Sequence, residues 1–155
     1  MIIRHLNADD YEAADVLLAE LHRLHAEGRP DIYKPLPHPY SLEDFTKLIN
    51  DETVIASAAE EEGRLAGICI VSTSSAAKSP MILSRPLAYM EILCVNPEFR
   101  RKGIGRLLFE HVVTEAKSRG AERLDLMAWS FNNDALDFYT SMGMTPQRYL
   151  LEKKL

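Results

Sequence analysis

The chain has 155 residues, of which 46% are hydrophobic, and a formal net charge of −5 at pH 7. A chain of this length and apolar share buries a core of its own, so we expect a single domain over residues 1–155 and exclude a disordered chain. The acidic balance argues against nucleic acid as the main partner. No apolar run approaches the ~18 residues of a membrane span and no signal peptide begins the chain, which predicts a cytoplasmic protein without a membrane partner.

The first half of the chain predicts a strand followed by two helices. Residues 1–6 are a short apolar stretch typical of a strand, and Asn7 or Asp9 can cap the helix that follows. Gly28 ends this helix. A proline-rich loop comes next, and Ser41 can cap a second, short helix.

A hairpin and a long connection follow the two helices. Residues 53–59 and 64–73 have the composition of strands, and the segment Glu61-Glu62-Gly63 between them is a turn signal. Residues 74–86 are rich in small residues and proline, and this connection is long for a hairpin loop.

The second half of the chain alternates strands and helices. Residues 89–95 and 122–129 predict strands, residues 104–119 and 134–141 predict helices, and residues 148–152 predict a final strand. The order is therefore strand, two helices, three strands, helix, strand, helix, strand. This order predicts a mixed α/β fold with antiparallel strands first and a parallel crossover later.

The most informative segment joins the strand at 89–95 to the helix that begins near residue 104. It consists of Arg100-Arg101-Lys102-Gly103-Ile104-Gly105. The first turn of a helix leaves N–H groups without partners and carries partial positive charge, and glycine lets the backbone approach a phosphate. The segment lacks the Walker A pattern, and Leu108 stands where the dinucleotide fingerprint needs its third glycine. We therefore expect a different phosphorylated ligand; the alternative is a turn whose charges face solvent.

Two motifs resemble those of the GNAT superfamily of N-acetyltransferases. The first is Arg100-x-x-Gly103-x-Gly105, preceded by residues 91–98, which resembles the acetyl-CoA-binding motif of the family. The second is Asn132-x-x-Ala135-x-x-Phe138-Tyr139, followed by Met142-Gly143-Met144, with methionine at 144 where phenylalanine is usual. The resemblance implies a mixed α/β fold with a twisted sheet of six to seven strands, flanked by about four helices and splayed near its middle. It also implies acetyl-CoA as the co-substrate and no metal.

The same resemblance indicates how the coenzyme would be held. Backbone amides of residues 101–105 would bind its pyrophosphate, with basic side chains adding charge, and the backbone of residues 93–95 would pair with its pantetheine arm. Asn132 would bond the pantetheine or phosphate arm, but it is also a good helix N-cap, and both roles stay open. The residues to which the resemblance assigns coenzyme binding are Leu93, Cys94, Val95, Arg100, Arg101, Lys102, Gly103, Ile104, Gly105, Arg106, Asn132, Ala135 and Tyr139.

Two residues are candidates for catalytic proton transfer. Tyr139 matches the tyrosine that in many family members lies near the coenzyme sulfur, where a phenol can donate a proton to the leaving thiolate; the alternative is a packed aromatic side chain. Glu91 is a lone carboxylate in an apolar strand, so it should be paired or face a cavity. By resemblance it could deprotonate the acceptor amine or anchor its ammonium, and the alternative is an exposed residue in a salt bridge.

Other reactive side chains have simpler interpretations. The two cysteines, Cys69 and Cys94, lie in apolar runs, which predicts reduced core residues rather than a disulfide. Transfer in the family is usually direct, and no histidine neighbours Cys94 in sequence, so an acetyl-cysteine intermediate is disfavoured. His22 and His25 share a helix face, but without a carboxylate pattern they are a weak metal signal.

The resemblance implies an N-acetyltransferase that moves the acetyl group directly to a primary amine of a small molecule, such as a polyamine or an amino acid. Two alternatives stay open: a protein or peptide acetyltransferase, and a non-catalytic module that binds acyl-CoA. Tyr33, Tyr40, Trp129 and Phe131 could form aromatic walls for a cationic acceptor or belong to the core. A homodimer is a further expectation, because the family often pairs through its C-terminal strands.

Overall fold

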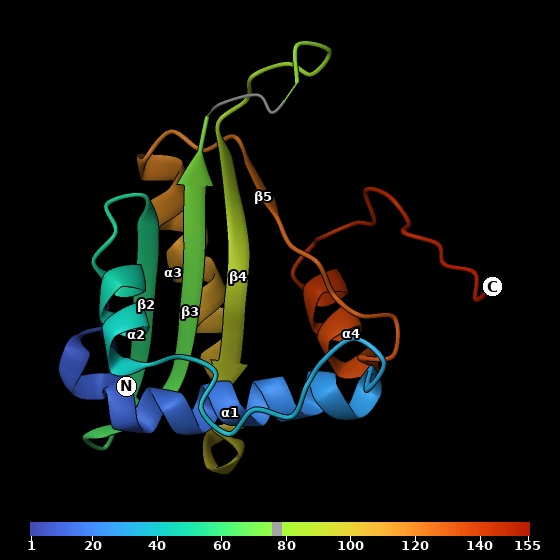
Figure 1. Cartoon of the computed structure of the whole chain (residues 1–155). Helices are drawn as coiled ribbons and strands as arrows, with labels where there is room; N and C mark the ends of the chain where they lie inside the picture. The colour runs from blue at the N-terminus through green and yellow to red at the C-terminus, as the bar shows by residue number, and fades with distance from the viewer. Residues whose placement is uncertain (76–78) are drawn as a thin grey trace.

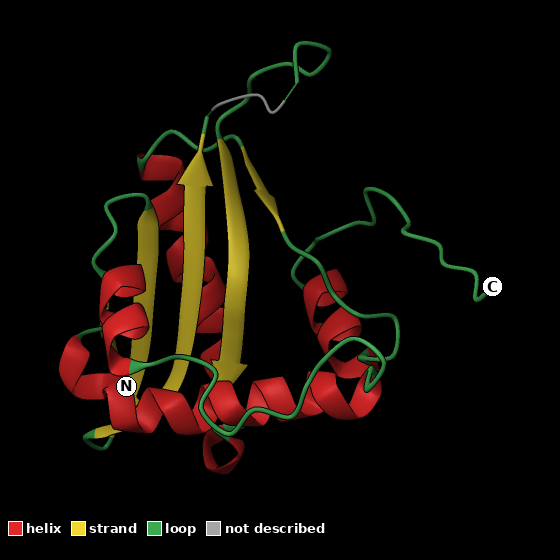
Figure 2. Ribbon diagram, viewed as in Figure 1, coloured by secondary structure: helices red, strands yellow, loops and turns green. Residues whose placement is uncertain are grey.

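A five-stranded sheet forms the centre of the protein, and four α-helices surround it (Figures 1 and 2). The structure is a computed structural model and describes residues 1–75 and 79–155. The strands lie in chain order, β1 to β5; β1 to β4 are antiparallel, and β5 is parallel to β4. Their bounds are β1 Ile2–His5, β2 Val54–Glu61, β3 Arg64–Ser74, β4 Leu87–Val95 and β5 Arg123–Asp125.

The helices cover both faces of the sheet. Their bounds are α1 Tyr11–Gly28, α2 Leu42–Ile49, α3 Ile104–Ser118 and α4 Asn133–Ser141. Helices α1 and α2 lie on one face, α3 lies on the opposite face, and α4 stands beside the sheet beyond β5 (Figure 1). Two short 3₁₀ helices, Ala8–Asp10 and Pro97–Phe99, precede α1 and α3. In the part of the chain described, no helix combines the length and apolar character needed to cross a membrane.

Two hydrophobic clusters follow from the alternation of side chains along the strands. On β3, Ile68 and Ile70 belong to the cluster under α1 and α2, whereas Cys69 and Val71 belong to the cluster under α3. Because successive strand residues point to opposite faces, a continuous apolar strand such as β3 supplies both cores at once. The sheet is therefore buried on both sides in its middle.

Local signals in the sequence form the expected caps and turn. Asn7 accepts a hydrogen bond from the amide of Asp9 and takes part in a capping box, and Ser41 accepts one from the amide of Asp44 at 3.1 Å. Glu62 and Gly63 have φ of 53° and 71°, which is the geometry of a tight β-hairpin turn between β2 and β3. The predicted hairpin and the start of α2 are confirmed, whereas Asn7 caps the 3₁₀ helix that leads into α1 and not α1 itself.

The prediction of four helices is confirmed, but the prediction of six to seven strands is wrong: the described residues contain five. Residues 148–152 are extended but have no strand neighbour, so the expected final strand is absent. The strand expected over 122–129 is also shorter, because β5 pairs with β4 only over Arg123–Asp125. Strand pairing needs a second strand in register, and neither segment finds one beyond these residues. Within the expected connection 74–86, residues 76–78 lie outside the described residues.

The core under α3 provides a matched test of packing. Leu108 is fully buried between α3 and the sheet, whereas its neighbour Leu107 lies on the exposed side of the helix. We expect Leu108→Ala to lower the free energy of unfolding by about 2–5 kcal/mol, because it leaves a cavity that the core cannot close. Leu107→Ala should change it by less than about 0.5 kcal/mol. Urea titration of both variants measures the difference, and equal losses would contradict the assigned face.

Candidate active site

Strands β4 and β5 pair for three residues and then separate. The pairs are Leu87–Arg123, Ala88–Leu124 and Tyr89–Asp125, and no pair between these strands follows in the described residues. Figure 1 shows β5 leading away from β4 toward the loop before α4. The β5-facing side of β4 therefore has no strand partner after Tyr89. Leu93, Cys94 and Val95, which the sequence predicts to contact a coenzyme, lie on this part of β4.

A β-bulge marks the point where the two strands separate. In the β3–β4 ladder Ile70 pairs with Ile92 and Val71 pairs with Met90, so Glu91 is an extra residue without a partner on β3. The bulge moves the side chains that follow to the other face: Met90 packs in the α3 cluster and Ile92 packs in the α1–α2 cluster. Because Glu91 alternates with Met90, its side chain lies on the α1–α2 face, and the bulge brings Ile92 to that same face.

The Glu91 carboxylate is exposed and has a polar neighbour on β3. Its Oε1 accepts a hydrogen bond from Ser72 Oγ at 2.9 Å, and Ser72 follows Ile68 and Ile70 on the α1–α2 face. Tyr40, from the loop before α2, lies near enough that burial and the Glu91 charge together raise the pKa of its phenol. Glu91 has no ion pair among the described residues, and its catalytic role stays a prediction.

The loop after β4 places the start of α3 at the end of the unpaired strand side. Two of its residues have left-handed backbones, Arg101 with φ of 61° and Gly103 with φ of 80°. Gly103 is the N-cap and offers no side chain to the first turn. The N–H groups of Ile104, Gly105 and Arg106 have no acceptor in the described residues, as the geometry of a first helical turn requires. Three amides and the helix dipole thus point toward the same region.

Gly105 lies where three elements meet. A Cβ at this position would lie 3.5 Å from the ring of Phe138 on α4 and 3.7 Å from Val95 on β4. The first turn of α3, the end of β4 and α4 therefore meet at Gly105, where a Cβ would make ordinary van der Waals contacts.

The basic side chains of the loop have different surroundings. Arg100 bonds Glu20 of α1 at 2.7 Å and donates from Nε to the carbonyl of Val95 at 3.2 Å, so it ties the loop to α1. The ammonium of Lys102 lies 5.0 Å from the ring centre of Phe99. Arg101 has no ion-pair partner in the part of the chain described. Arg101 and Lys102 are therefore the side chains left to attract an anion, and the charge of Arg100 is already engaged.

The second motif forms the start of α4. Asn132 is the N-cap, and its Oδ1 accepts a hydrogen bond from the amide of Ala135 at 3.2 Å. The capping role is thus present, and no acceptor for the side-chain NH₂ is found among the described residues. The same residue is therefore able to cap the helix and to donate to a ligand.

Tyr139 lies on α4 against the α3 cluster. Its ring centre is 5.3 Å from that of Phe138 and 6.5 Å from that of Phe109. Burial raises the pKa of Tyr139 to about 12, with a smaller contribution from the nearby thiols of Cys69 and Cys94. The phenol is therefore neutral at physiological pH. Tyr139 packs on the α3 side of β4, whereas Glu91 lies on the α1–α2 side.

The two cysteines and the histidines have structural surroundings. Both cysteines are free thiols, and burial raises the pKa of Cys94 to about 12, which leaves it without nucleophilic thiolate. His22 bonds the carbonyl of Lys34 at 2.7 Å, and His38 bonds Asp15 at 2.7 Å. The described residues include no cluster of three or more His, Cys, Asp or Glu side chains suited to a metal ion.

Aromatic side chains of the loop before α4 contact the segment that follows α1. Trp129 donates to the hydroxyl of Tyr33 at 3.2 Å and stacks on Phe131 with ring centres 6.1 Å apart. Arg29, at the end of α1, lies 4.9 Å over the ring of Trp129. The sequence predicts aromatic residues here, but Arg29, Glu20 and Ser72 were missed, because each comes from an element far from either motif.

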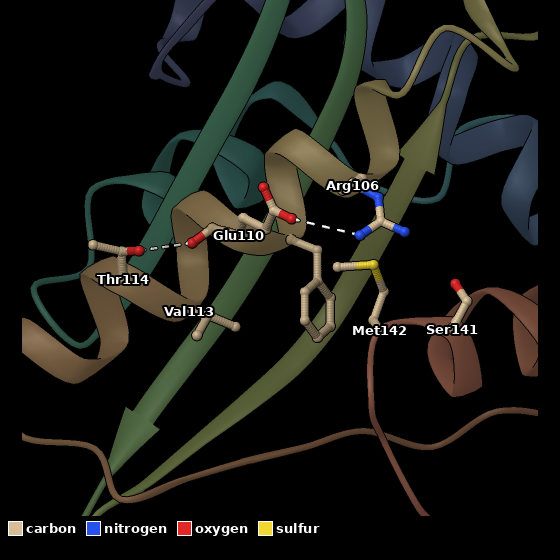
Figure 3. A pocket seen from close by; sticks show the side chains of 7 residues that line it. Arg106, Glu110, Val113, Thr114, Ser141 and Met142 are labelled. Carbon is tan, nitrogen blue, oxygen red and sulfur yellow. Dashed lines mark hydrogen bonds and ion pairs between the residues drawn. The ribbon is translucent and has the colours of Figure 1, made fainter.

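A separate hollow of about 370 Å³ lies between α3 and α4 (Figure 3). Arg106 is the one predicted site residue among its walls. The other residues that line it are Phe109, Glu110, Val113, Thr114, Ser141 and Met142.

The arrangement agrees with comparisons to known proteins. Residues 18–144 match the model of the acetyltransferase (GNAT) family. The bS18-alanine N-acetyltransferase of Salmonella typhimurium, which acts on a ribosomal protein, is 39% identical over 51 residues, or 33% of this chain and 34% of that protein. The L-ornithine N5-acetyltransferase of Arabidopsis thaliana is 33% identical over 64 residues, or 41% of this chain and 28% of that protein. The matched stretches thus span about a third of each curated relative or less.

A solved structure matches the whole fold. A point mutant of the BH1408 protein of Bacillus halodurans has a TM-score of 0.95 and 28% identity, with 100% of this chain and 99% of that chain covered. The chain belongs to the acetyltransferase (GNAT) family.

Two glycines with equivalent backbones test the role of the loop. Gly103 and Gly120 flank α3 and have φ of 80° and 86°, and a Cβ added at either position would meet no atom within 4 Å. Alanine in a left-handed conformation costs about 1–2 kcal/mol, so Gly103→Ala and Gly120→Ala should destabilise the protein similarly. We expect Gly103→Ala alone to weaken coenzyme A binding by about tenfold or more, since it shifts the amides at the start of α3.

Calorimetry with coenzyme A, together with urea unfolding, measures both effects. An unchanged affinity for coenzyme A in Gly103→Ala, or an equal loss of affinity in Gly120→Ala, would show that the amides at the start of α3 do not hold the coenzyme.

Proposed function

We propose that the protein is an acetyl-CoA-dependent N-acetyltransferase that transfers the acetyl group directly to a primary amine of a small molecule. Membership of the GNAT family supports the reaction class. The observation that carries the proposal is the unpaired side of β4, which begins at the bulge of Glu91 and ends at the uncapped first turn of α3. One end of this unpaired segment has a carboxylate, and the other end has backbone amides that can bind an anion.

The residues present fit acetyl-CoA. The free amides of Ile104, Gly105 and Arg106 would hold the diphosphate, with the charges of Arg101 and Lys102 nearby. The unpaired backbone of β4 at Leu93–Val95 would bind the pantetheine amides as an additional strand. Asn132 would donate its free side-chain NH₂ to the same arm. When bound, acetyl-CoA supplies an acetyl thioester and a thiolate leaving group.

Glu91 would accept the proton of the acceptor amine or anchor its ammonium group. An aliphatic amine has a pKa of about 10.4, so it arrives as an ammonium and must lose a proton before it can attack. Glu91 is exposed on the α1–α2 face, and Ser72 holds one of its oxygens through a 2.9 Å hydrogen bond. The other oxygen is left to accept the ammonium proton, directly or through a water, or to anchor the ammonium.

Tyr139 would act on the leaving group from the opposite face. Its pKa of about 12 keeps the phenol protonated, so it is always ready to donate. A free thiol has a pKa of about 8.5, so complete proton transfer from this phenol to a thiolate is uphill. We therefore assign Tyr139 a hydrogen bond to the developing thiolate charge, with the proton arriving later from solvent.

The proline-rich loop on the acceptor side favours a small amine over a protein as the acceptor. Three contacts fasten the proline-rich loop over α1: Tyr11 donates to the Tyr40 carbonyl at 2.8 Å, His38 bonds Asp15, and His22 bonds the Lys34 carbonyl. These contacts fix the loop on α1, and its end at Tyr40 lies near the Glu91 carboxylate. A loop fixed there would restrict the acceptor side, whereas a peptide needs an open groove. The ornithine enzyme among the relatives acts on a small amine, and the ribosomal-protein enzyme supports the second candidate, a peptide acceptor.

An amine panel tests the proposed reaction. The protein is incubated with acetyl-CoA and, in turn, polyamines, amino acids, aminoglycosides and N-terminal peptides, and thiol release is followed. Turnover with a small amine supports the proposal, and turnover with peptides alone supports the second candidate. Tight binding of coenzyme A with no turnover above the rate of hydrolysis would show that the protein is a binding module, and it would refute catalysis.

Removing one hydroxyl tests the role of Tyr139. We expect Tyr139→Phe to lower kcat by about tenfold to a hundredfold with little change in the affinity for coenzyme A, because the lost bond forms mainly as charge develops. Tyr149→Phe, on an exposed residue, is the matched control. Since the pKa of Tyr139 is about 12, wild-type kcat should show no alkaline fall from this group below about pH 10. Unchanged kcat in Tyr139→Phe would remove it from the mechanism.

The carboxylate is tested in the same way. We expect Glu91→Gln to lower kcat/KM by about a hundredfold or more, because the amide keeps the shape but accepts no proton. Glu98→Gln, which alters a carboxylate paired with Arg64 in the neighbouring loop, should have little effect. Steady-state kinetics with the best amine of the panel compares the two, and a Glu91→Gln enzyme with wild-type kcat/KM would rule out Glu91 as base or anchor.

A further inference from the structure

The sheet face under α1 and α2 changes from apolar to polar along β3 and β4. Ile68 and Ile70 of β3 belong to the buried α1–α2 cluster, whereas Ser72, the next residue of β3 on that face, is only half-buried. On β4 the same face carries Glu91, which is exposed, and Tyr89, which is half-buried. This change marks the place where the helices no longer cover the sheet, so the face is accessible there.

Tyr89 lies in one group with Ser72 and Glu91. It pairs with Ser72 in the β3–β4 register, and Ser72 donates its hydroxyl to Glu91 at 2.9 Å. Tyr89 and Glu91 are two residues apart on β4, so their side chains point to the same side of the sheet. Burial raises the pKa of the Tyr89 phenol, and the charges of Glu91 and Asp125 raise it further. The Tyr89 side chain therefore lies near the Glu91 carboxylate.

Tyr40 reaches the same place from the loop between α1 and α2, which runs back along α1 (Figure 1). Its ring packs against the α1–α2 cluster, and burial together with the charge of Glu91 raises the pKa of its phenol. Its hydroxyl has no hydrogen-bond partner among the described residues. Two tyrosine rings from separate elements are thus near one carboxylate.

Contacts with α1 and α2 fix the position of Tyr40. Tyr11 donates its hydroxyl to the Tyr40 carbonyl at 2.8 Å, and the ring centre of Tyr11 is 5.5 Å from that of Phe45, which is fully buried. Two residues before Tyr40, His38 bonds Asp15 of α1 at 2.7 Å. Tyr40 is therefore held in place before an acceptor arrives, which reduces the entropy lost on binding.

The other aromatic candidates for the acceptor side are engaged elsewhere. Trp129 already has a cation on its ring, because Arg29 lies 4.9 Å from the ring centre. It also contacts the rings of Tyr33 and Phe131, so these residues form one cluster with Trp129 at its centre. Of the four aromatic residues that the sequence suggests as acceptor walls, Tyr40 is the one that lies near Glu91.

We propose that the rings of Tyr40 and Tyr89 and the carboxylate of Glu91 together bind the ammonium of an aliphatic amine, so that the two tyrosines determine the specificity of the acceptor site. A cation is attracted to the face of an aromatic ring within about 6 Å of its centre, and a carboxylate attracts it further. The site would therefore bind a strongly basic alkylamine and reject an uncharged molecule of the same length. Tyr11 is a positioning residue that acts through Tyr40. The inference rests on the proposed function, because it assigns the acceptor of that reaction.

Tyrosine ring signals test this site without any turnover. The protein has six tyrosines, and ¹³C labelling of their rings gives signals that tyrosine-to-phenylalanine substitutions assign. With coenzyme A present, butylamine should shift the signals of Tyr40 and Tyr89, whereas 1-butanol at the same concentration should not. The signal of the exposed Tyr149 is the internal control. Shifts confined to other rings, or no shift of Tyr40 and Tyr89 at millimolar butylamine, would overturn the proposal.

Two substitutions separate the ring of Tyr40 from its hydroxyl. We expect Tyr40→Leu to raise the dissociation constant of butylamine by about tenfold, because the ring is lost, and Tyr40→Phe to raise it by less than about twofold. The Tyr89 signal reports binding in both variants, and Tyr149→Leu is the matched control. Equal losses in Tyr40→Leu and Tyr40→Phe, or no loss in Tyr40→Leu, would contradict binding by the ring.

A double-mutant cycle tests the positioning role of Tyr11. Tyr11→Phe keeps the ring beside Phe45 and removes the hydrogen bond to the Tyr40 carbonyl. It should raise the dissociation constant of butylamine by about threefold in the wild-type background and cause no further rise in Tyr40→Leu, because it acts through Tyr40. An equal rise in both backgrounds would show a general structural effect instead.

The same samples separate this inference from the proposed function. Butylamine shifts at Tyr40 and Tyr89 without acetyl transfer to any amine would support this site and refute the proposed reaction. Acetyl transfer to alkylamines with no response at Tyr40 or Tyr89 would support the reaction and overturn this site.

Discussion

The separation of β4 from β5 is the constraint on which the rest of the structure depends. The parallel pairing stops after three residues, where β5 ends at Asp125, while β4 runs on to Val95. Each backbone group left without a partner costs free energy unless water or a ligand satisfies it. The bulge at Glu91 lies at this point, so one irregularity both changes the face of the side chains and places a carboxylate at the upper end of the unpaired segment.

After Tyr89 no strand pairing joins β4 to β5 in the described residues, so side chains hold the two sides of this separation together. The ring of Phe138 on α4 lies beside Gly105 at the start of α3, and Arg29, which follows α1, lies over Trp129 and pairs with Glu152. Exposed ion pairs contribute about 0–1 kcal/mol each and aromatic contacts about 0.5–1.5 kcal/mol. Each of these contacts therefore contributes a modest free energy. Together they hold the two sides of the separation in place without closing the segment in which a ligand would lie.

Much of the site could be predicted because its motifs encode backbone geometry. Gly103 indicates a left-handed N-cap and Asn132 indicates a helix start; both signals are local and both have their expected form, whereas the close approach of a phosphate at Gly105 stays a prediction. What could not be predicted depends on distant partners. Arg100 is engaged by Glu20, which lies eighty residues away in the chain. Residues 148–152 have a β-forming pattern, but a strand also needs the edge of another strand to pair with. No local signal in the sequence indicates which edge that is.

The account is tested most directly by observing which backbone amides respond to coenzyme A. In ¹⁵N-labelled protein titrated with coenzyme A, the largest shifts should occur at residues 103–106, with further shifts along the unpaired side of β4 at residues 93–95. Saturation at these positions would place the diphosphate at the start of α3 and the pantetheine arm along the separated strand. No shift at residues 103–106 at millimolar coenzyme A, or shifts confined to other parts of the protein, would contradict it.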